Sequence, residues 1–316
     1  MMPIDQFIIF FLLLLTGFFC KRFGVLTDPA VNSLNMFIIN IAYPCLILGR
    51  TTGMDMDAQI FSSFMLALFI NLGILLLFGV YARLCFRGKR FDGEDRSAME
   101  FASISSNNGF MGFPIALTFF GDLGLLYMIA CNIALNAMFF TYGILLLKRG
   151  RGIPGEPFGK KLRDFAKMIA HPKLSAAIVG IILCYNGIRL PEIAESYLSI
   201  VGEVTTPLVM VSIGTMLAGQ FGLSSFKRRA VMVPALNKLF VVPAIAALIV
   251  WFLPLDPLVK TIIIISNALP VAAVVPILCE QYGRDKGLAG ESLVITTLVS
   301  MVTIPLAVWL LGMAWG

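Results

Sequence analysis

Long apolar runs, separated by short polar and basic segments, repeat along the whole of the 316-residue chain. A helix needs roughly 20 apolar residues to cross the hydrocarbon core of a bilayer. The runs predict ten membrane-spanning helices, at residues 5–20, 30–50, 58–82, 97–121, 123–147, 173–189, 196–219, 227–252, 257–281 and 287–312. We therefore expect an all-α integral membrane protein.

The basic residues support this count and orient the chain. Of the 24 Lys and Arg residues, 20 follow odd-numbered spans, and three, Arg50, Arg189 and Lys260, follow even-numbered spans. Because positive charge gathers on the cytoplasmic side of a membrane, both termini are predicted to lie outside. The remaining basic residue, Lys238, falls inside the eighth span. The first run, residues 5–19, has basic residues only after it, so we expect a retained span rather than a cleaved signal peptide.

The longest loop is rich in Gly, Pro and basic residues and divides the spans into two sets of five. We predict a first five-helix repeat at residues 1–148, a cytoplasmic linker at 149–172 and a second repeat at 173–316. Because five is odd, the second repeat enters the membrane in the opposite orientation. Within the linker, apolar residues at helical spacing alternate with basic ones, which fits a basic amphipathic helix on the inner surface or an ordinary linker equally well.

The two halves carry matching patterns of proline, glycine and polar residues. Pro114 and Pro276 each precede a glycine by seven positions, and a Ser-Asn pair lies upstream of each proline. A second match pairs Asn40 with Glu203, because each stands four residues before a proline. Inverted repeats with Gly- and Pro-interrupted spans in corresponding positions indicate a secondary transporter whose site lies near the bilayer midplane.

Interruptions in spans 4 and 9 indicate where such a site lies. Span 4 is predicted to lose its helix around Asn107–Phe113 and to restart at Pro114. Span 9 is predicted to break around Asn267–Pro270 and to restart near Pro276. If the breaks cross, two helix N-termini point at one place, and their N–H groups and positive dipole ends favour an anion there. The carbonyl groups that end the first half-helices suit a cation.

The predicted substrate-binding residues are Asn107, Asn108, Gly109, Pro114, Asn267, Pro270 and Pro276. A simpler alternative is that the asparagines cap helix ends and the glycines permit close backbone crossing. Lys238 and Glu203 are candidates for ion coupling or charge compensation, because a charge inside a span is expensive to bury. Four roles are open for Lys238. It attracts an anionic substrate, it replaces a coupling cation as a fixed charge, its side chain snorkels to the membrane surface, or it pairs with a carboxylate such as Glu203. Two roles are open for Glu203: it is a proton carrier during transport, or it lies just outside the hydrocarbon.

The other polar residues in the spans are expected to be structural. Asn71, midway along span 3, is predicted to form a hydrogen bond between helices. The glutamates near the inner ends of spans are predicted to lie in water: Glu100, Glu280 and Glu291.

Composition excludes several classes of protein. The chain is 59% hydrophobic and 13% charged with a mean hydropathy of +0.90, which excludes a soluble globular domain. Its net charge of +6 comes from short clusters without the aromatic-basic stripe that binds nucleic acid. The six cysteines lack metal-ligand spacing, and no Walker A, G-x-S-x-G or His/Glu metal motif is present. We expect no metal, no cofactor and no nucleic-acid partner.

Three span motifs, "GFMGFPIALTFFG", "TTPLVMVSIGTMLAG" and "NALPVAAVVPILCEQYG", resemble the auxin efflux carrier family, which includes plant PIN auxin exporters and bacterial malonate or malate permeases. The resemblance implies two inverted five-helix repeats, as in sodium/proton antiporters and bile acid symporters, with crossed broken helices 4 and 9. Asn107, Pro114, Pro270 and Pro276 match the family's crossover positions. Spans 1, 2, 6 and 7 would form a scaffold and a homodimer surface, and the other spans would form the moving unit. The long regulatory loop of large plant members is absent.

The sequence thus favours a secondary transporter of a small organic anion, such as malonate, malate or an auxin-like acid. Alternating access of the elevator type would move the substrate at the crossover, coupled to protons, to sodium or to the membrane potential alone. The resemblance places the protein in the lipid of a bacterial inner membrane. The alternatives are a sodium or proton channel or antiporter and, with no converging nucleophile, acid/base pair or metal cluster in its favour, a membrane-embedded enzyme.

Overall fold

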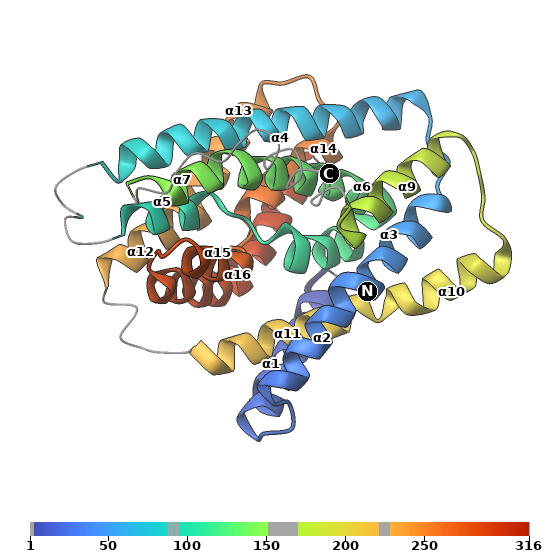
Figure 1. The fold of residues 1–316 in the computed structure, drawn as a ribbon. Helices are drawn as coiled ribbons and strands as arrows, with labels where there is room; N and C mark the ends of the chain where they lie inside the picture. The colour runs from blue at the N-terminus through green and yellow to red at the C-terminus, as the bar shows by residue number, and fades with distance from the viewer. Residues whose placement is uncertain (1–2, 88–90, 92–94, 151–169, 221–227, 316) are drawn as a thin grey trace. The chain divides into compact units, whose positions relative to one another are not determined.

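The computed structural model describes residues 3–87, 91, 95–150, 170–220 and 228–315, and these residues are almost entirely helical (Figure 1). Most of the predicted linker, including its segment at helical spacing, lies outside the described residues. The helices are α1 (Pro3–Arg22), α2 (Asp28–Phe37), α3 (Tyr43–Thr52), α4 (Ala58–Cys85), α5 (Arg96–Ile104), α6 (Phe113–Met138), α7 (Ile144–Lys148), α9 (Pro172–Tyr185), α10 (Glu192–Glu203), α11 (Thr205–Gln220), α12 (Arg229–Leu236), α13 (Val242–Trp251), α14 (Pro257–Ala268), α15 (Val274–Gln281) and α16 (Lys286–Trp315). Short π-helical turns lie between some of them: η1 (Ile38–Ala42), η3 (Asn108–Gly112), η4 (Phe139–Gly143) and η6 (Asn237–Val241).

Several helical runs have the length and apolar character of membrane spans. Within the described residues, six runs meet both criteria: Asp28–Thr52, Ala58–Cys85, Asn108–Lys148, Glu192–Gly219, Arg229–Trp251 and Lys286–Ala314. The helices α9 and α14 are apolar but shorter. These runs confirm the all-helical membrane protein that the sequence predicts. The arrangement of ten spans in two inverted repeats stays a prediction.

Prolines explain where three of the four π-helical turns in the described residues fall. Pro44, Pro114 and Pro243 are the second residues of α3, α6 and α13, and a π-helical turn precedes each of these helices. Proline lacks an N–H donor, and its ring clashes with the carbonyl group four residues earlier in a regular α-helix. The wider π-helical turn relieves that clash, so the helix continues past the proline.

Gly121 divides α6 into two helical stretches. Its φ of 65° and ψ of −158° are not helical, and an L side chain rarely adopts this φ. The predicted boundary between spans 4 and 5 falls at the same place. Gly283, which the sequence comparison pairs with Gly121, has the same φ of 65°.

The described residues form two compact units that each draw on both halves of the sequence. Unit 1 comprises the described residues within Met1–Ser62, Leu117–Leu126 and Pro154–Gly219. Unit 2 comprises those within Ser63–Ala116, Tyr127–Ile153 and Gln220–Gly316. This division differs from the two predicted repeats, which also stay a prediction.

In unit 1, glycines allow helix backbones to touch. The helices α1, α2 and α11 run beside one another (Figure 1). A Cβ atom on Gly17 would lie 2.0 Å from the carbonyl oxygen of Val211, and one on Gly214 would lie 2.1 Å from that of Leu14. Both distances are far inside van der Waals contact, so only glycine fits at these positions. Small residues take this role in membranes because no hydrophobic effect drives helix association there.

In unit 2, α5 and α14 form the centre. Every residue from 97 to 108 and from 261 to 272 is buried. The neighbouring helices α4 and α16 instead keep apolar side chains exposed, among them Leu77 (49%) and Val302 (71%), as lipid-facing helices do. The two helices at the centre are those that the sequence predicts to be broken.

Candidate functional site

The first break begins where α5 ends at Ile104. Ser105 has extended backbone angles (φ −95°, ψ 110°), and the next helical turn begins at Asn108. Asn107 caps this turn: its side-chain oxygen accepts a hydrogen bond from the N–H of Phe110 (3.3 Å), and its carbonyl oxygen accepts from Met111 (3.0 Å). Asn107 therefore has the capping role that the sequence offered as the simpler alternative. The cap leaves open whether Asn107 also contacts substrate.

The second break separates α14 from α15. Leu269 is extended (φ −62°, ψ 151°), as expected for a residue that precedes a proline. Pro270 lies within the break and is buried, and the next helix begins at Val274. Pro276 is the third residue of α15, where its missing N–H group has no acceptor in the helix to lose.

The two breaks lie against each other as a short antiparallel bridge between Ser106 and Val271. The N–H of Asn107 donates to the carbonyl oxygen of Pro270 (2.9 Å), and the N–H of Ala272 donates to that of Ser105 (3.1 Å). Extended backbone inside a membrane needs such partners because hydrocarbon offers none. Two motifs about 160 residues apart in sequence thus satisfy each other's backbone groups.

Buried amide side chains surround this bridge. Asn71 on α4 donates to the carbonyl oxygen of Cys131 (3.2 Å) and accepts a hydrogen bond from the Nδ2 of Asn267 (2.8 Å). Asn108 donates to the Oγ of Ser266 (2.8 Å). The predicted interhelical hydrogen bond of Asn71 is confirmed. Its direct contact with the second break was not predicted, because sequence separation gives no sign of which side chains meet.

Lys238 contacts both breaks. The residue lies in η6, its exposed fraction is 0%, and its Nζ donates to the Oγ of Ser106 (2.6 Å) and to the carbonyl oxygen of Asn267 (2.8 Å). Its complete burial excludes snorkelling to the membrane surface. Both acceptors in the described part of the chain are neutral oxygens, and neither belongs to a carboxylate. The site thus contains a buried basic group without an anionic partner among the described residues.

Access to the site differs from residue to residue. Asn107 (6%), Asn108 (1%) and Asn267 (0%) are buried, and so is Pro114. The first residues of the second half-helices are less covered: Gly109 is half-buried and Val274 is 37% exposed. The first residues of the second half-helices are therefore the more exposed part of the site, and its amides are buried.

Glu203 lies in unit 1, at the end of α10, and its side chain is 63% exposed. It accepts a hydrogen bond from Ser199 and lies 3.6 Å from the guanidinium of Arg50, which also lies 3.8 Å from Asp122. The structure gives Glu203 these partners within unit 1 and gives Lys238 two neutral partners within unit 2. Its exposure favours the alternative that Glu203 lies outside the hydrocarbon.

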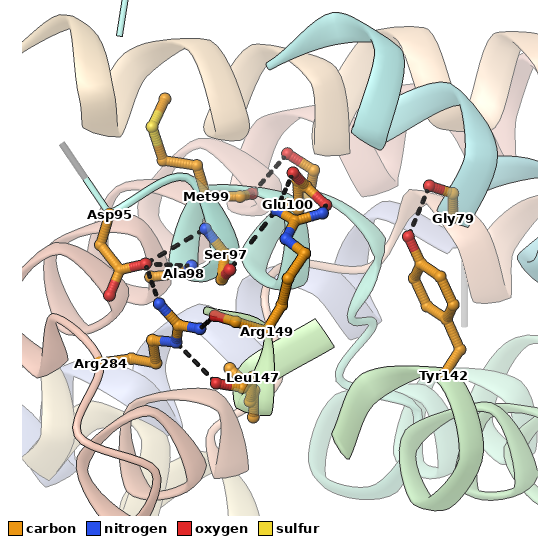
Figure 2. A network of polar contacts seen from close by, with 11 residues as sticks. Gly79, Asp95, Ser97, Ala98, Met99, Glu100, Tyr142, Leu147, Arg149 and Arg284 are labelled. Atoms are coloured by element: carbon orange, nitrogen blue, oxygen red, sulfur yellow. Dashed lines mark hydrogen bonds and ion pairs between the residues drawn. The ribbon is translucent and has the colours of Figure 1, made fainter. Parts of the chain in front are cut away.

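A second polar network in unit 2 was not predicted (Figure 2). The guanidinium of Arg284 donates to the carbonyl oxygens of Leu147 (2.7 Å) and Arg149 and pairs with Asp95 (3.4 Å). Asp95 in turn caps α5 by accepting from the N–H of Ser97 (3.1 Å). Because Arg284 follows α15, this network joins half-helices of both broken spans.

The same network corrects the prediction for Glu100. Its side chain is 3% exposed and pairs with the guanidinium of Arg149 at 2.6 and 3.2 Å (Figure 2). The prediction of a solvated Glu100 is wrong because Arg149, beyond the end of α7, neutralises the carboxylate inside the protein. Glu280 is exposed, as predicted, and Glu291 is about one-third exposed.

The described residues contain no group of three His, Cys, Asp or Glu side chains able to hold a metal ion. The chemistry available at the two breaks is therefore that of amides, hydroxyls, helix ends and one lysine. Such groups bind and orient a ligand.

The chain is similar to named transporters over nearly its whole length. A family model described as "Membrane transport protein" matches residues 3–309. An uncharacterized transporter of Methanocaldococcus jannaschii is 31% identical over 98% of this chain and 99% of its own length. An uncharacterized transporter of Methanothermobacter thermautotrophicus is 28% identical over 93% of both. A protein of Rhizobium meliloti named "Putative malonate transporter" is 23% identical over 93% of this chain and 91% of its own length.

Proposed function

The chain belongs to the membrane transport protein family, and we propose that it is a secondary transporter of a small organic anion. The family match and the related transporters make it an integral membrane transporter and not an enzyme. They also bear out the resemblance to auxin efflux carriers noted in the span motifs. The substrate and the mechanism rest on the arguments below.

Lys238 is the observation that carries the proposal. The residue is fully buried, and its Nζ donates to neutral oxygens of both breaks. A buried cation without a counter-charge is unfavourable, and a bound anion supplies that charge. An ammonium group has three N–H donors, so one remains beyond the two hydrogen bonds within the described residues. A carboxylate beside Lys238 would accept it.

The helix ends favour the same ligand. The second half-helices begin at Asn108 and Val274. The N–H of Phe110 is capped by Asn107 and that of Val275 donates to Ala272, which leaves the N–H groups of Asn108, Gly109 and Val274 without an acceptor among the described residues. Each N-terminus also carries the positive end of a helix dipole. We therefore propose that the carboxylate of the substrate lies between these helix ends and Lys238. The contact residues would be Asn107, Asn108, Gly109, Pro114, Asn267, Pro270 and Pro276.

The proposed architecture is ten spans in two inverted repeats with both termini outside the bacterial inner membrane. The non-helical backbone at Gly121 supports it, since it falls at the predicted boundary between the fourth and fifth spans, and so does the matching φ of Gly283. We propose that one group of helices moves the site across the membrane in an elevator-like step and that spans 1, 2, 6 and 7 form a scaffold and homodimer surface. The name of the Rhizobium meliloti relative makes malonate the first substrate to test.

Uptake of radiolabelled malonate, malate and indole-3-acetate into proteoliposomes tests the proposal. We expect saturable uptake of at least one of these acids, competed by other carboxylates and lost in the Lys238→Met variant. The matched control is Lys286→Met, because Lys286 is 57% exposed and pairs with Glu280 outside the breaks. Ion currents without carboxylate competition would instead support a channel. Unchanged transport by a folded Lys238→Met variant would refute the site.

A further inference from the structure

The amide of Asn267 has only one orientation that fits its surroundings. Its Nδ2 donates to the Oδ1 of Asn71 (2.8 Å) and to the carbonyl oxygen of Ile263 (2.9 Å). A carbonyl oxygen only accepts, so the group that faces Ile263 must be the NH₂ group. The orientation of Asn71 is fixed in the same way, because its own NH₂ group faces the carbonyl oxygen of Cys131. The remaining atom of the Asn267 amide, Oδ1, is therefore an acceptor.

This acceptor has no partner among the described residues, although Asn267 is completely buried. An unpaired buried acceptor is expensive, and native proteins rarely leave one without a protein, water or ligand donor. The Oδ1 of Asn108 and the Oγ of Ser105 are also buried and without partners in the described part of the chain. The amide of Asn108 is less informative, because its partner Ser266 Oγ both donates and accepts. The unpaired Oδ1 of Asn267 thus indicates that a hydrogen-bond donor is missing beside this side chain.

An unpaired acceptor is satisfied either by a cation or by a neutral hydrogen-bond donor. The position of Lys238 favours the neutral donor. Its Nζ lies 2.8 Å from the backbone oxygen of Asn267, the residue whose side-chain oxygen needs a partner. A metal cation at that side-chain oxygen would lie near a buried ammonium group, and like charges repel strongly at low dielectric. A neutral O–H or N–H group avoids this repulsion.

We propose that the substrate carries a hydrogen-bond donor in addition to its carboxylate, and that the Oδ1 of Asn267 accepts this donor. The inference rests on the proposed function. It names the substrate class as acids with a hydroxyl, an N–H or a second, protonated carboxyl group. Lys238 and the helix ends hold the carboxylate, and Asn267 selects for the donor.

Matched acids test this inference in the wild-type protein. The dicarboxylates are compared at alkaline pH, where both of their carboxyl groups are ionised and neither is a donor. Malate then has a hydroxyl donor, succinate lacks it without added bulk, and 2-methoxysuccinate keeps the oxygen but loses the donor. Lactate, propionate and 2-methoxypropionate form the same series for monocarboxylates, and indole-3-acetate with its N1-methyl derivative tests an N–H donor. In at least one series we expect the donor-bearing acid to compete with labelled substrate about 5- to 150-fold better than both other forms, since a buried acceptor is then left unpaired.

A variant then assigns the selectivity to Asn267. In Asn267→Ala, the preference for the donor-bearing acid over the acid without a donor should fall to less than about twofold. Ser292→Ala is the control, because Ser292 is a buried residue of α16 whose hydroxyl donates to Leu288 rather than to either break. Its preference should match that of the wild type. If Asn267→Ala does not fold, the comparison of acids in the wild type still decides the question.

The outcomes separate the inference from the proposed function. If no carboxylate competes or is transported, the proposed function fails. If acids with and without a donor compete equally in every series, transport stands and the inference is wrong, because water then satisfies Asn267. If competition is equal and transport requires sodium, a cation occupies the acceptor and the inference is again wrong.

Discussion

Unit 1 and unit 2 hold their helices together by different means. In unit 1, Gly17 and Gly214 bring α1 and α11 into direct backbone contact, and a single described side-chain hydrogen bond, from Ser212 to Asn35, joins α11 to α2. In unit 2, α5 and α14 are broken, and hydrogen bonds from Lys238 and Asn267 join the parts. Close packing tolerates no added atom, whereas the polar network of unit 2 leaves a donor on Lys238 and an acceptor on Asn267 for a ligand. The first arrangement suits a rigid support, and the second suits a ligand site.

Gly214→Ala should have the largest effect, on the folded state itself. The new Cβ would lie 2.1 Å from the carbonyl oxygen of Leu14, and backbone atoms cannot move aside as a flexible side chain does. We expect destabilisation at or above the upper end of the roughly 1–3 kcal/mol typical of overpacking, seen as a lower melting temperature and less folded protein in detergent. Gly219→Ala in the same helix is the control, since a Cβ there meets no atom of the described residues within 4 Å. Equal stability of the two variants would contradict the packing argument.

Lys238→Met should have the opposite effect to Gly214→Ala. Transport should be lost, and the fold should be retained. Methionine has nearly the volume of lysine and removes a buried charge whose burial opposes folding. We expect transport to fall at least about 100-fold, while the melting temperature stays the same or rises. Transport and thermal unfolding of the same preparation measure both effects. A variant that loses transport only because it unfolds would show that Lys238 is needed for structure and would remove the contrast between the units.

Arg284→Lys should weaken substrate binding indirectly. Arg284 joins half-helices of both broken spans, so its loss should disturb their positions although Arg284 itself does not contact the ligand. The guanidinium reaches acceptors on Leu147, Arg149 and Asp95 at once, and a single ammonium group cannot meet that geometry. We expect the KM for transport to rise about tenfold, by loss of roughly 1.5 kcal/mol of charged hydrogen bonding. Lys286→Ala, which removes an exposed ion pair two residues away, should leave KM unchanged. Full activity of Arg284→Lys would mean that only its charge matters.

The sequence was most informative where local chemistry decides structure. Both breaks were predicted within a few residues. The first covers Ser105–Asn107 rather than the predicted Asn107–Phe113, because a π-helical turn at Asn108–Gly112 carries the helix past Pro114, and the second falls at Leu269–Ala273 around Pro270. The predicted boundary between spans 4 and 5 falls at Gly121, whose positive φ a glycine permits. None of these inferences requires knowledge of which segments touch.

Contacts between distant segments could not be predicted. The burial of Glu100 depends on Arg149, which lies 49 positions away, and Asn267 reaches Asn71 across 196 positions. A single sequence shows that Lys238 is inside a span, but not that its acceptors are Ser106 and Asn267. The candidate site residues could therefore be predicted from sequence, whereas the contacts on which the proposed selectivity rests are visible only in the structure.

Glu203→Gln should have the smallest effect on transport. It tests whether Glu203 is a proton carrier or lies outside the hydrocarbon, which the sequence left open. As a proton carrier, Glu203 would need a neutral form that is used during transport, and Gln would abolish any proton dependence. The structure shows a carboxylate that is 63% exposed and lies 3.6 Å from Arg50, an ion pair of the kind that contributes about 0–1 kcal/mol. We expect less than a twofold change in transport and an unchanged dependence on external pH, measured as uptake at a series of pH values. Loss of that dependence in Glu203→Gln alone would make unit 1 a carrier of protons as well as a support, and the contrast with unit 2 would no longer hold.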